Sequence, residues 1–242
     1  MTDFVQLWHN GPYFAQSEHF RLGTDSILLA DFANTASARS GIDLGCGSGI
    51  LPLLLLLRSE KLHMTGLEIL PAAVAAAREN IKVNALHERC DVVCGDIRDY
   101  RGLFASGQFD LVISNPPYFP KGSGISSPDP DRASARTELD CSLSDICSAA
   151  AYLCRTGGSF FIVHRAERMA ELICRLSASG LEPKRLRTVA HSAASAPSLV
   201  LIEAKRGAKP GLKIMPALIL HDPDGSESAE VLRIYHREEL DP

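Results

Sequence analysis

Short apolar runs alternate along the chain with longer segments of helical composition, and this alternation restricts the fold more than any other feature. Short runs bounded by turn residues suit strands buried on both faces, and strands separated by helices pair in parallel. We therefore predict an α/β fold with a mostly parallel sheet and helices on both faces. The expected strands are Gly41–Leu44, His63–Glu68, Cys90–Cys94, Phe109–Ser114 and Ser159–Val163, and the expected helices are Ile50–Leu62, Pro71–Val83, Leu143–Cys154 and Glu167–Ser179.

Two further apolar runs near the C-terminus break this alternation. Leu186–Ala190 and Leu199–Ala204 flank the stretch HSAASAP, and strands joined by so short a loop pair antiparallel. They bring the expected sheet to seven strands, with an antiparallel hairpin towards the C-terminal end. A chain of 242 residues fits one such domain. We predict a single domain over residues 1–242, with a helical extension at 1–38 and a tail at 205–242 that wraps around it.

The composition argues against several classes of protein. The longest apolar run, Ile50–Leu57, is far shorter than the ~20 residues that cross a bilayer. The N-terminus MTDFVQLWHN has neither the positive start nor the apolar core of a signal peptide. The seven cysteines are scattered without the spacing of zinc sites. We therefore expect a cytoplasmic protein that has no metal site and no membrane partner.

Positive charge gathers in the C-terminal part of an otherwise acidic chain. The formal net charge is −4, so the chain is not a generally basic nucleic-acid coat. Seven Lys and Arg residues nevertheless lie between Lys184 and Lys213, against one acid, Glu203. Such a segment is either a solvated edge or a face for an anionic partner.

A glycine-rich turn follows the first expected strand in the stretch IDLGCGSGILP. Gly45, Gly47 and Gly49 allow a tight turn and a close approach of the backbone to a ligand. Their spacing differs from the G-x-G-x-x-G of pyrophosphate sites. Asp43, just before the first glycine, would repel a phosphate but suits a cationic ligand. A tight strand-to-helix turn without a ligand is the alternative.

Acidic residues also follow the second and third expected strands. Glu68 lies about 20 residues past Gly47, where a carboxylate can accept hydrogen bonds from ribose hydroxyls. Asp96 can accept one from an adenine amino group, with Ile69 and Ile97 in apolar contact with the ring. Because ligands bind at the carboxyl ends of the strands in such sheets, we predict that these side chains share one adenosine site.

The fourth expected strand ends in Asn115-Pro116-Pro117-Tyr118, and the motifs together resemble those of the class I S-adenosylmethionine-dependent methyltransferases. In that superfamily the NPPY element marks the branch that methylates an amino nitrogen attached to a planar system. Looser matches resemble the bacterial tRNA (adenine-N6)-methyltransferases that act beside the anticodon of a valine tRNA. These looser matches are Gly23–Ala30, Arg132, Arg136 and Pro183–Arg187.

The resemblance implies a Rossmann-like class I methyltransferase fold, S-adenosyl-L-methionine as cofactor and a tRNA as substrate. The implied cofactor-binding residues are Thr24, Asp25, Asp43, Gly45, Cys46, Gly47, Gly49, Glu68, Ile69, Asp96, Ile97 and Asn115. The implied catalytic residues are Asn115, Pro116, Pro117 and Tyr118. The implied substrate-binding residues are Tyr118, Phe119, Lys121, Arg132, Arg136, Lys184, Arg185 and Arg187.

The chemistry of an adenine amine explains the NPPY residues. The amine is a poor nucleophile because its lone pair is delocalised into the ring. The Asn115 oxygen and the Pro116 carbonyl can accept its two N–H groups, which favours a pyramidal nitrogen whose lone pair faces the methyl donor. Pro117 holds φ near about −65° and restricts Pro116, so the backbone acceptor is set in advance. Tyr118 and Phe119 can stack on the base, which is worth roughly 1–3 kcal/mol per base.

Three other functions stay open on the sequence alone. The protein-glutamine N5 methyltransferases of release factors share NPPY, although few residues here precede the first expected strand compared with that family's helical N-terminal domain. A DNA adenine methyltransferase would carry a sizeable recognition domain. A catalytically idle fold that binds RNA is the third alternative.

Overall fold

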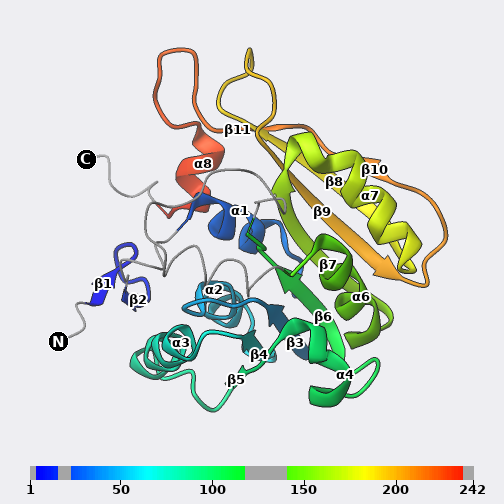
Figure 1. The fold of residues 1–242 in the computed structure, drawn as a ribbon. Coiled ribbons are helices and arrows are strands. Elements are labelled where there is room, and N and C mark those ends of the chain that lie inside the picture. Colours follow the sequence, from blue (N-terminus) through cyan, green and yellow to red (C-terminus); the bar gives the residue numbers. More distant parts are fainter. Residues whose placement is uncertain (1–3, 16–22, 118–140, 237–242) are drawn as a thin grey trace, which may run out of the picture.

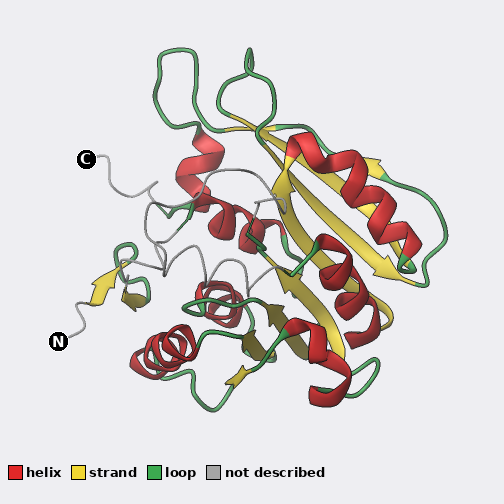
Figure 2. Cartoon of the chain, viewed as in Figure 1, coloured by secondary structure: helices red, strands yellow, loops and turns green. Residues whose placement is uncertain are grey.

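A nine-stranded sheet with helices on both faces forms the centre of the computed structural model (Figure 1, Figure 2). Its strand order is β10-β8-β9-β7-β6-β3-β4-β5, and β11 also pairs with β8. The structure describes residues 4–15, 23–117 and 141–236. Within these ranges, no helix is long and apolar enough to cross a membrane.

The elements have the following bounds. The strands are β1 (Phe4–Gln6), β2 (Tyr13–Ala15), β3 (Ser40–Leu44), β4 (His63–Glu68), β5 (Cys90–Cys94), β6 (Phe109–Ser114), β7 (Cys154–Arg165), β8 (Leu181–Ala190), β9 (Leu199–Arg206), β10 (Lys213–Ile214) and β11 (Leu218–Ile219). The helices are α1 (Thr24–Phe32), α2 (Ile50–Arg58), α3 (Pro71–Val83), α4 (Tyr100–Leu103), α6 (Leu143–Leu153), α7 (Met169–Ala178) and α8 (Ala229–Ile234).

The predicted mostly parallel sheet is confirmed. β3 pairs in parallel with β4 and β6, β4 with β5, and β6 with β7. β9 runs antiparallel to both β7 and β8, as expected for the C-terminal hairpin. The seven predicted strands are all present, and the tail adds β10 and β11, each paired with β8. These two-residue strands are too short to show a hydrophobic period, so no strand was predicted there.

The N-terminal extension differs from the predicted helical one. Of its described residues, α1 is helical, whereas β1 and β2 form an antiparallel pair. Side chains of α3 complete the hydrogen bonding of β2. The Asn80 side-chain oxygen accepts the N–H of Ala15 at 2.8 Å, and the Asn84 oxygen accepts the N–H of Tyr13 at 2.9 Å. These partners are distant in sequence, so local patterns could not reveal the strand.

Two apolar clusters, one on each face of the sheet, hold the helices in place. Alternate residues of β7 point to opposite faces because the side-chain period of a strand is two. Phe161 belongs to the cluster that includes residues of α1, α2 and α8, and its neighbour Phe160 belongs to the cluster that includes residues of α6 and α7. Both rings are fully buried. The sheet interior is therefore filled by packing, and polar chemistry is left to the strand ends.

Two arginines of β8 connect helices α1 and α8 to the sheet. Arg185 forms an ion pair with Glu203 of β9 and donates to the carbonyl of Phe32 in α1 at 2.9 Å. Its guanidinium also lies over the Phe32 ring, 4.6 Å from the centroid. Arg187 makes a two-pronged ion pair with Glu230 of α8, at 2.8 and 2.6 Å. Both side chains are therefore part of the packing of the domain.

We expect Arg185→Ala to lower the free energy of unfolding by about 3 kcal/mol, because the 7%-exposed Glu203 would stay buried without its cation. Lys184→Ala is the matched control: the Lys184 amine donates to an exposed carbonyl at 3.0 Å, and its loss should cost under about 1 kcal/mol. Denaturant unfolding followed by circular dichroism measures both. Adding Glu203→Gln should recover part of the Arg185→Ala loss. Equal stability of the two alanine variants would contradict the buried pair.

Candidate functional site

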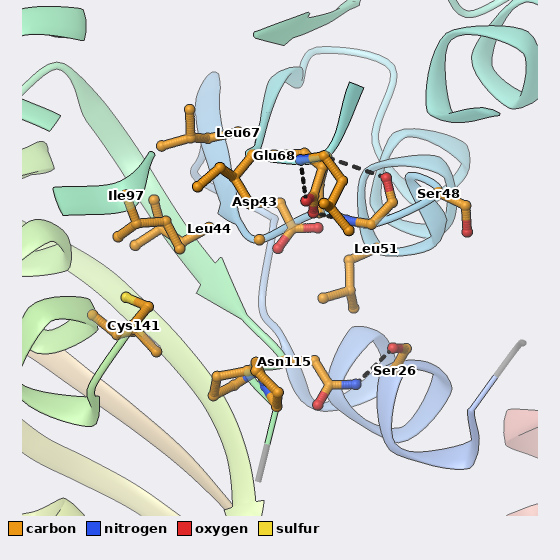
Figure 3. A pocket seen from close by; sticks show the side chains of 18 of the residues that line it. Ser26, Asp43, Leu44, Ser48, Leu51, Leu67, Glu68, Ile97, Asn115 and Cys141 are labelled. Carbon is orange, nitrogen blue, oxygen red and sulfur yellow. Dashed lines mark hydrogen bonds between the residues drawn. The ribbon is translucent and has the colours of Figure 1, made fainter. Parts of the chain in front are cut away.

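The carboxyl ends of β3, β4 and β6 open into a cavity of about 640 Å³ (Figure 3). These strands are parallel neighbours, so the loops that leave them meet at one edge of the sheet. The volume falls within the ~300–1,000 Å³ of small-molecule sites. Across ranges 4–15, 23–117 and 141–236, no three His, Cys, Asp or Glu side chains gather as a metal site would require.

Most of the predicted site residues that the structure describes line this cavity. They are Asp25, Asp43, Gly45, Cys46, Gly47, Glu68, Ile69, Asp96, Ile97, Asn115, Pro116 and Pro117. Thr24 and Gly49 are exceptions. Thr24 is exposed at the start of α1. Gly49 has φ +83°, and a Cβ there would lie 3.1 Å from the Cβ of Ala77, so this glycine allows α2 to pack against α3.

The cavity also has lining residues that the sequence did not single out. They are Ser26, Leu44, Ser48, Ile50, Leu51, Leu67, Leu70, Arg98, Cys141 and Ile146. Most are apolar, and their pattern in the sequence indicates only a buried core. Cys141 and Ile146 come from the region of α6, which the fold brings to the cavity from far along the chain. Ser26 lies inside the Gly23–Ala30 match to the tRNA methyltransferases, and that resemblance is the sequence feature that could have identified it.

Glu68 holds the glycine loop in place. One carboxylate oxygen accepts the N–H of Gly47 at 2.9 Å, and the other accepts the N–H of Leu70 at 2.9 Å. The loop needs this support because Gly45, Gly47 and Gly49 all have positive φ, at 77°, 54° and 83°. A carboxylate oxygen has two lone pairs, so each can accept a second hydrogen bond from a ligand in the cavity.

Asp43 carries a buried carboxylate with no hydrogen-bond partner within the described part of the chain. The residue is 1% exposed, and neither of its oxygens is paired. Burial, followed by repulsion from Glu68, raises the pKa of Asp43 well above its ordinary value. An unpaired buried carboxylate costs free energy unless a ligand brings positive charge or donors. The site is therefore suited to a cationic ligand, as the sequence predicted.

Arg98 shifts the pKa of Asp96 in the direction opposite to that of Asp43. The Arg98 backbone N–H donates to Asp96 at 2.8 Å, and its guanidinium Nε donates to both carboxylate oxygens at 3.0 and 2.8 Å. Chiefly through this side-chain hydrogen bond, the pKa of Asp96 is lowered, so the carboxylate stays ionised. Ile97, between the two, adds an apolar surface to the cavity wall. Together they present an acceptor beside an apolar edge, which suits a purine.

Asn115 lies at the tip of β6, next to α1 (Figure 3). Its side-chain nitrogen donates to the hydroxyl oxygen of Ser26 at 2.9 Å. The residue before it, Ser114, is fully buried and donates from its hydroxyl to the carbonyl of Leu44 at 2.8 Å. Hydrogen bonds thus connect the tip of β6 to both β3 and α1. They fix the position at which the segment Asn115-Pro116-Pro117 begins.

The remaining predicted residues do not contribute to the described cavity. Tyr118, Phe119, Lys121, Arg132 and Arg136 lie outside the described residues. Lys184, Arg185 and Arg187 lie on β8, separated from β6 by β7 and β9. Because acids of β9 and α8 pair with the two arginines, their charges are used inside the domain. This pairing weakens the case for the two arginines as phosphate contacts, and the substrate-binding role of Lys184, Arg185 and Arg187 stays a prediction.

We expect Asp43→Asn to stabilise the ligand-free protein, by about 1–3 kcal/mol at pH 8 and by less at pH 5. Because the folded-state pKa of Asp43 lies above the unfolded value, stability is lost as the pH rises from the unfolded pKa through the folded one. Asparagine does not ionise and escapes this loss. Thermal unfolding at both pH values measures the effect, with the exposed Asp99→Asn as control. A shift in Tm that is the same at both pH values would contradict the assignment.

Comparisons with known proteins identify the family of the chain. Residues 13–179 match the family model of the methyltransferase small domain. A tRNA1(Val) (adenine(37)-N6)-methyltransferase of Tolumonas auensis is 32% identical over 215 residues, which cover 88% of this chain and 87% of the relative. A protein of the same name from Escherichia coli is 34% identical over 210 residues, covering 86% and 83%.

Solved structures agree with the fold. A predicted O-methyltransferase from Agrobacterium tumefaciens superposes with a TM-score of 0.71 at 20% identity, covering 88% of this chain and 96% of that one. At this identity the likeness concerns the fold alone. The resemblance drawn from the motifs is confirmed by the sequence relatives and the family model. The chain therefore belongs to the methyltransferase small domain family and is related to tRNA1(Val) (adenine(37)-N6)-methyltransferases.

Proposed function

We propose that residues 1–242 act as one domain that transfers a methyl group from S-adenosyl-L-methionine to N6 of an adenine in the anticodon loop of a tRNA. The observation that carries the proposal is the convergence of Asp43, Glu68, Asp96 and Asn115 on one cavity. The names of the sequence relatives, which match over most of both chains, supply the substrate class. A tRNA substrate would place the protein in the cytoplasm.

The cavity residues fit S-adenosyl-L-methionine. Asp43 would face the positive charge of the ligand and thereby gain the partner that it lacks. Glu68 would accept hydrogen bonds from the ribose hydroxyls, and Asp96 would accept one from the adenine amino group beside Ile97. When bound, the cofactor supplies an electrophilic methyl group on a sulfonium. The protein's own contribution is then to position the amine that receives it.

Asn115 and Pro116 would hold that amine. The Asn115 side-chain oxygen and the Pro116 carbonyl accept its two N–H groups, which draws the nitrogen out of the plane of the ring and exposes its lone pair. Pro117 keeps the carbonyl of Pro116 in place. A strong base is unnecessary, because the methylated amine is acidic and loses its proton to water. Catalysis therefore relies on orientation and preorganised acceptors.

The main rival is methylation of a protein glutamine, whose planar amide nitrogen suits the same two acceptors. The sequence relatives favour RNA, since those compared above are named as tRNA methyltransferases. An idle RNA-binding fold is disfavoured by Asp43, because a bound cationic ligand would offset the cost of its buried and unpaired carboxyl group.

Transfer of a labelled methyl group to tRNA, release factor and DNA in parallel tests the proposed function. We expect label in tRNA, identified as N6-methyladenosine by mass analysis of the nucleosides. Label on a release-factor glutamine would select the rival. Failure to bind S-adenosylmethionine, with no transfer to any of the three, would point to the idle fold.

Asn115→Ala should lower kcat by roughly 10²–10³, because it removes one preorganised acceptor whose hydrogen bond strengthens as the nitrogen becomes pyramidal. Asn115→Asp keeps an oxygen at the site and should retain more activity than Ala. Steady-state kinetics with tRNA measures both. Cofactor affinity, measured by calorimetry, should stay unchanged and serves as the control. Equal inactivity of the two variants, with cofactor binding intact, would refute the role as acceptor.

A further inference from the structure

Asn80 of α3 connects the glycine loop to the strand pair β1–β2. Its side-chain nitrogen donates to the carbonyl of Ser48 at 3.0 Å, and its side-chain oxygen accepts the backbone N–H of Ala15 at 2.8 Å. The residue is 0% exposed, so both hydrogen bonds are shielded from water. A backbone N–H can only donate and a backbone carbonyl can only accept, so these two partners fix the orientation of the amide.

Ser48 belongs to the glycine loop and lines the cavity (Figure 3). Its carbonyl cannot accept a helical hydrogen bond from the residue four positions on, because that residue is Pro52, which has no N–H. The amide of Asn80 supplies a donor instead. The preceding loop residue, Gly47, donates its N–H to Glu68 at 2.9 Å. Side chains of two different elements, α3 and β4, therefore fix neighbouring residues of the loop.

The strand pair β1–β2 lies against α3 beside this contact (Figure 1). Phe14 of β2 is 1% exposed and belongs to a core cluster. One turn beyond Asn80, Asn84 accepts the N–H of Tyr13 at 2.9 Å and donates to its carbonyl at 2.7 Å. Among the described residues, none of β1 or β2 lines the cavity. Asn80 is thus a direct hydrogen-bonded connection between the cavity and a strand pair outside it.

We propose that Asn80 is a positioning residue for S-adenosyl-L-methionine, and that it couples the order of the β1–β2 pair to the shape of the glycine loop. This inference rests on the cofactor site of the proposed function. Without the amide, the Ser48 carbonyl loses this partner and the loop spends part of its time in other conformations. A ligand that needs one loop conformation then binds more weakly, in proportion to the population of that conformation.

Losing one ordinary hydrogen bond shifts such an equilibrium by roughly 2–10-fold, so Asn80→Ala should raise the Kd for S-adenosyl-L-homocysteine by roughly the same factor. Calorimetry measures this Kd and compares it with that of the matched control Asn84→Ala. Asn84 holds the same strand pair from the same helix, and its side chain bonds to Tyr13 and to the carbonyl of Asn80. Both variants should lower Tm, whereas the Kd of Asn84→Ala should stay close to that of wild type.

Two results of this comparison would overturn the proposal. An equal loss of affinity in the two variants would mean that a general loosening of α3 and β2 is responsible. An unchanged Kd in Asn80→Ala would mean that the loop keeps its shape without the amide. Failure of the wild-type protein to bind S-adenosyl-L-homocysteine would instead refute the proposed cofactor site.

Hydrogen exchange, followed by mass spectrometry, tests the coupling in the wild-type protein itself. Because coupling between two sites is reciprocal, a ligand that orders the loop should also protect the Ala15 N–H. We expect saturating S-adenosyl-L-homocysteine to slow exchange within residues 4–15 of wild type but not of Asn80→Ala. The control is residues 213–219, which contain β10 and β11 and should exchange at the same rate with and without ligand. Exchange in residues 4–15 that ignores the ligand in wild type, or equal protection in Asn80→Ala, would contradict the coupling.

Discussion

The Glu68 carboxylate ties together the two loops on which the cavity depends. It accepts one N–H from the glycine loop after β3 and one from the turn after β4, both at 2.9 Å. The loop has positive φ at three alternate glycines, and Glu68 adds to the backbone hydrogen bonds that Gly45 and Cys46 donate to Leu67. The same negative charge contributes to the raised pKa of Asp43. A single side chain therefore both shapes the site and prepares its neighbour for a cationic ligand.

Two of the aspartates that line the cavity, Asp43 and Asp96, have environments that favour different protonation states. Asp96 is fixed and kept ionised by Arg98, so it is a ready acceptor for a neutral donor. Asp43 is buried and unpaired, so its charge is costly until a positive ligand arrives. Under the proposed function, the stability that this buried carboxyl group costs the free protein is offset when the cationic cofactor binds.

The parts of this arrangement that follow from strand ends were predictable from the sequence. Glu68 ends one expected strand, and Asp96 and Asn115 follow within two residues of two others. Parallel strands end at a common edge, so the convergence of these residues followed from the alternation alone. Side chains brought in from elsewhere were not predictable in this way. Ser26 enters the cavity from α1, and Cys141 enters from the region of α6. No local period marks either of them.

The basic segment near the C-terminus shows most clearly what the sequence alone cannot predict. Charge counting finds Arg185, Arg187 and Glu203 but not which charges pair, because Glu203 reaches β8 through strand pairing and Glu230 through the packing of α8. An excess of cations in a stretch of sequence is therefore a weak guide to a nucleic-acid surface. What decides is whether the folded chain leaves those charges unpaired.

The central claim is that the cavity at the ends of β3, β4 and β6 binds S-adenosyl-L-methionine with its methyl group towards Asn115. A crystal structure of the complex with S-adenosyl-L-homocysteine tests it most directly. We expect the adenine beside Asp96 and Ile97, the ribose hydroxyls bonded to Glu68, the amino group on the side of Asp43, and the sulfur on the side of Asn115. A ligand bound outside this cavity, or inside it with its sulfur turned away from Asn115, would contradict the account.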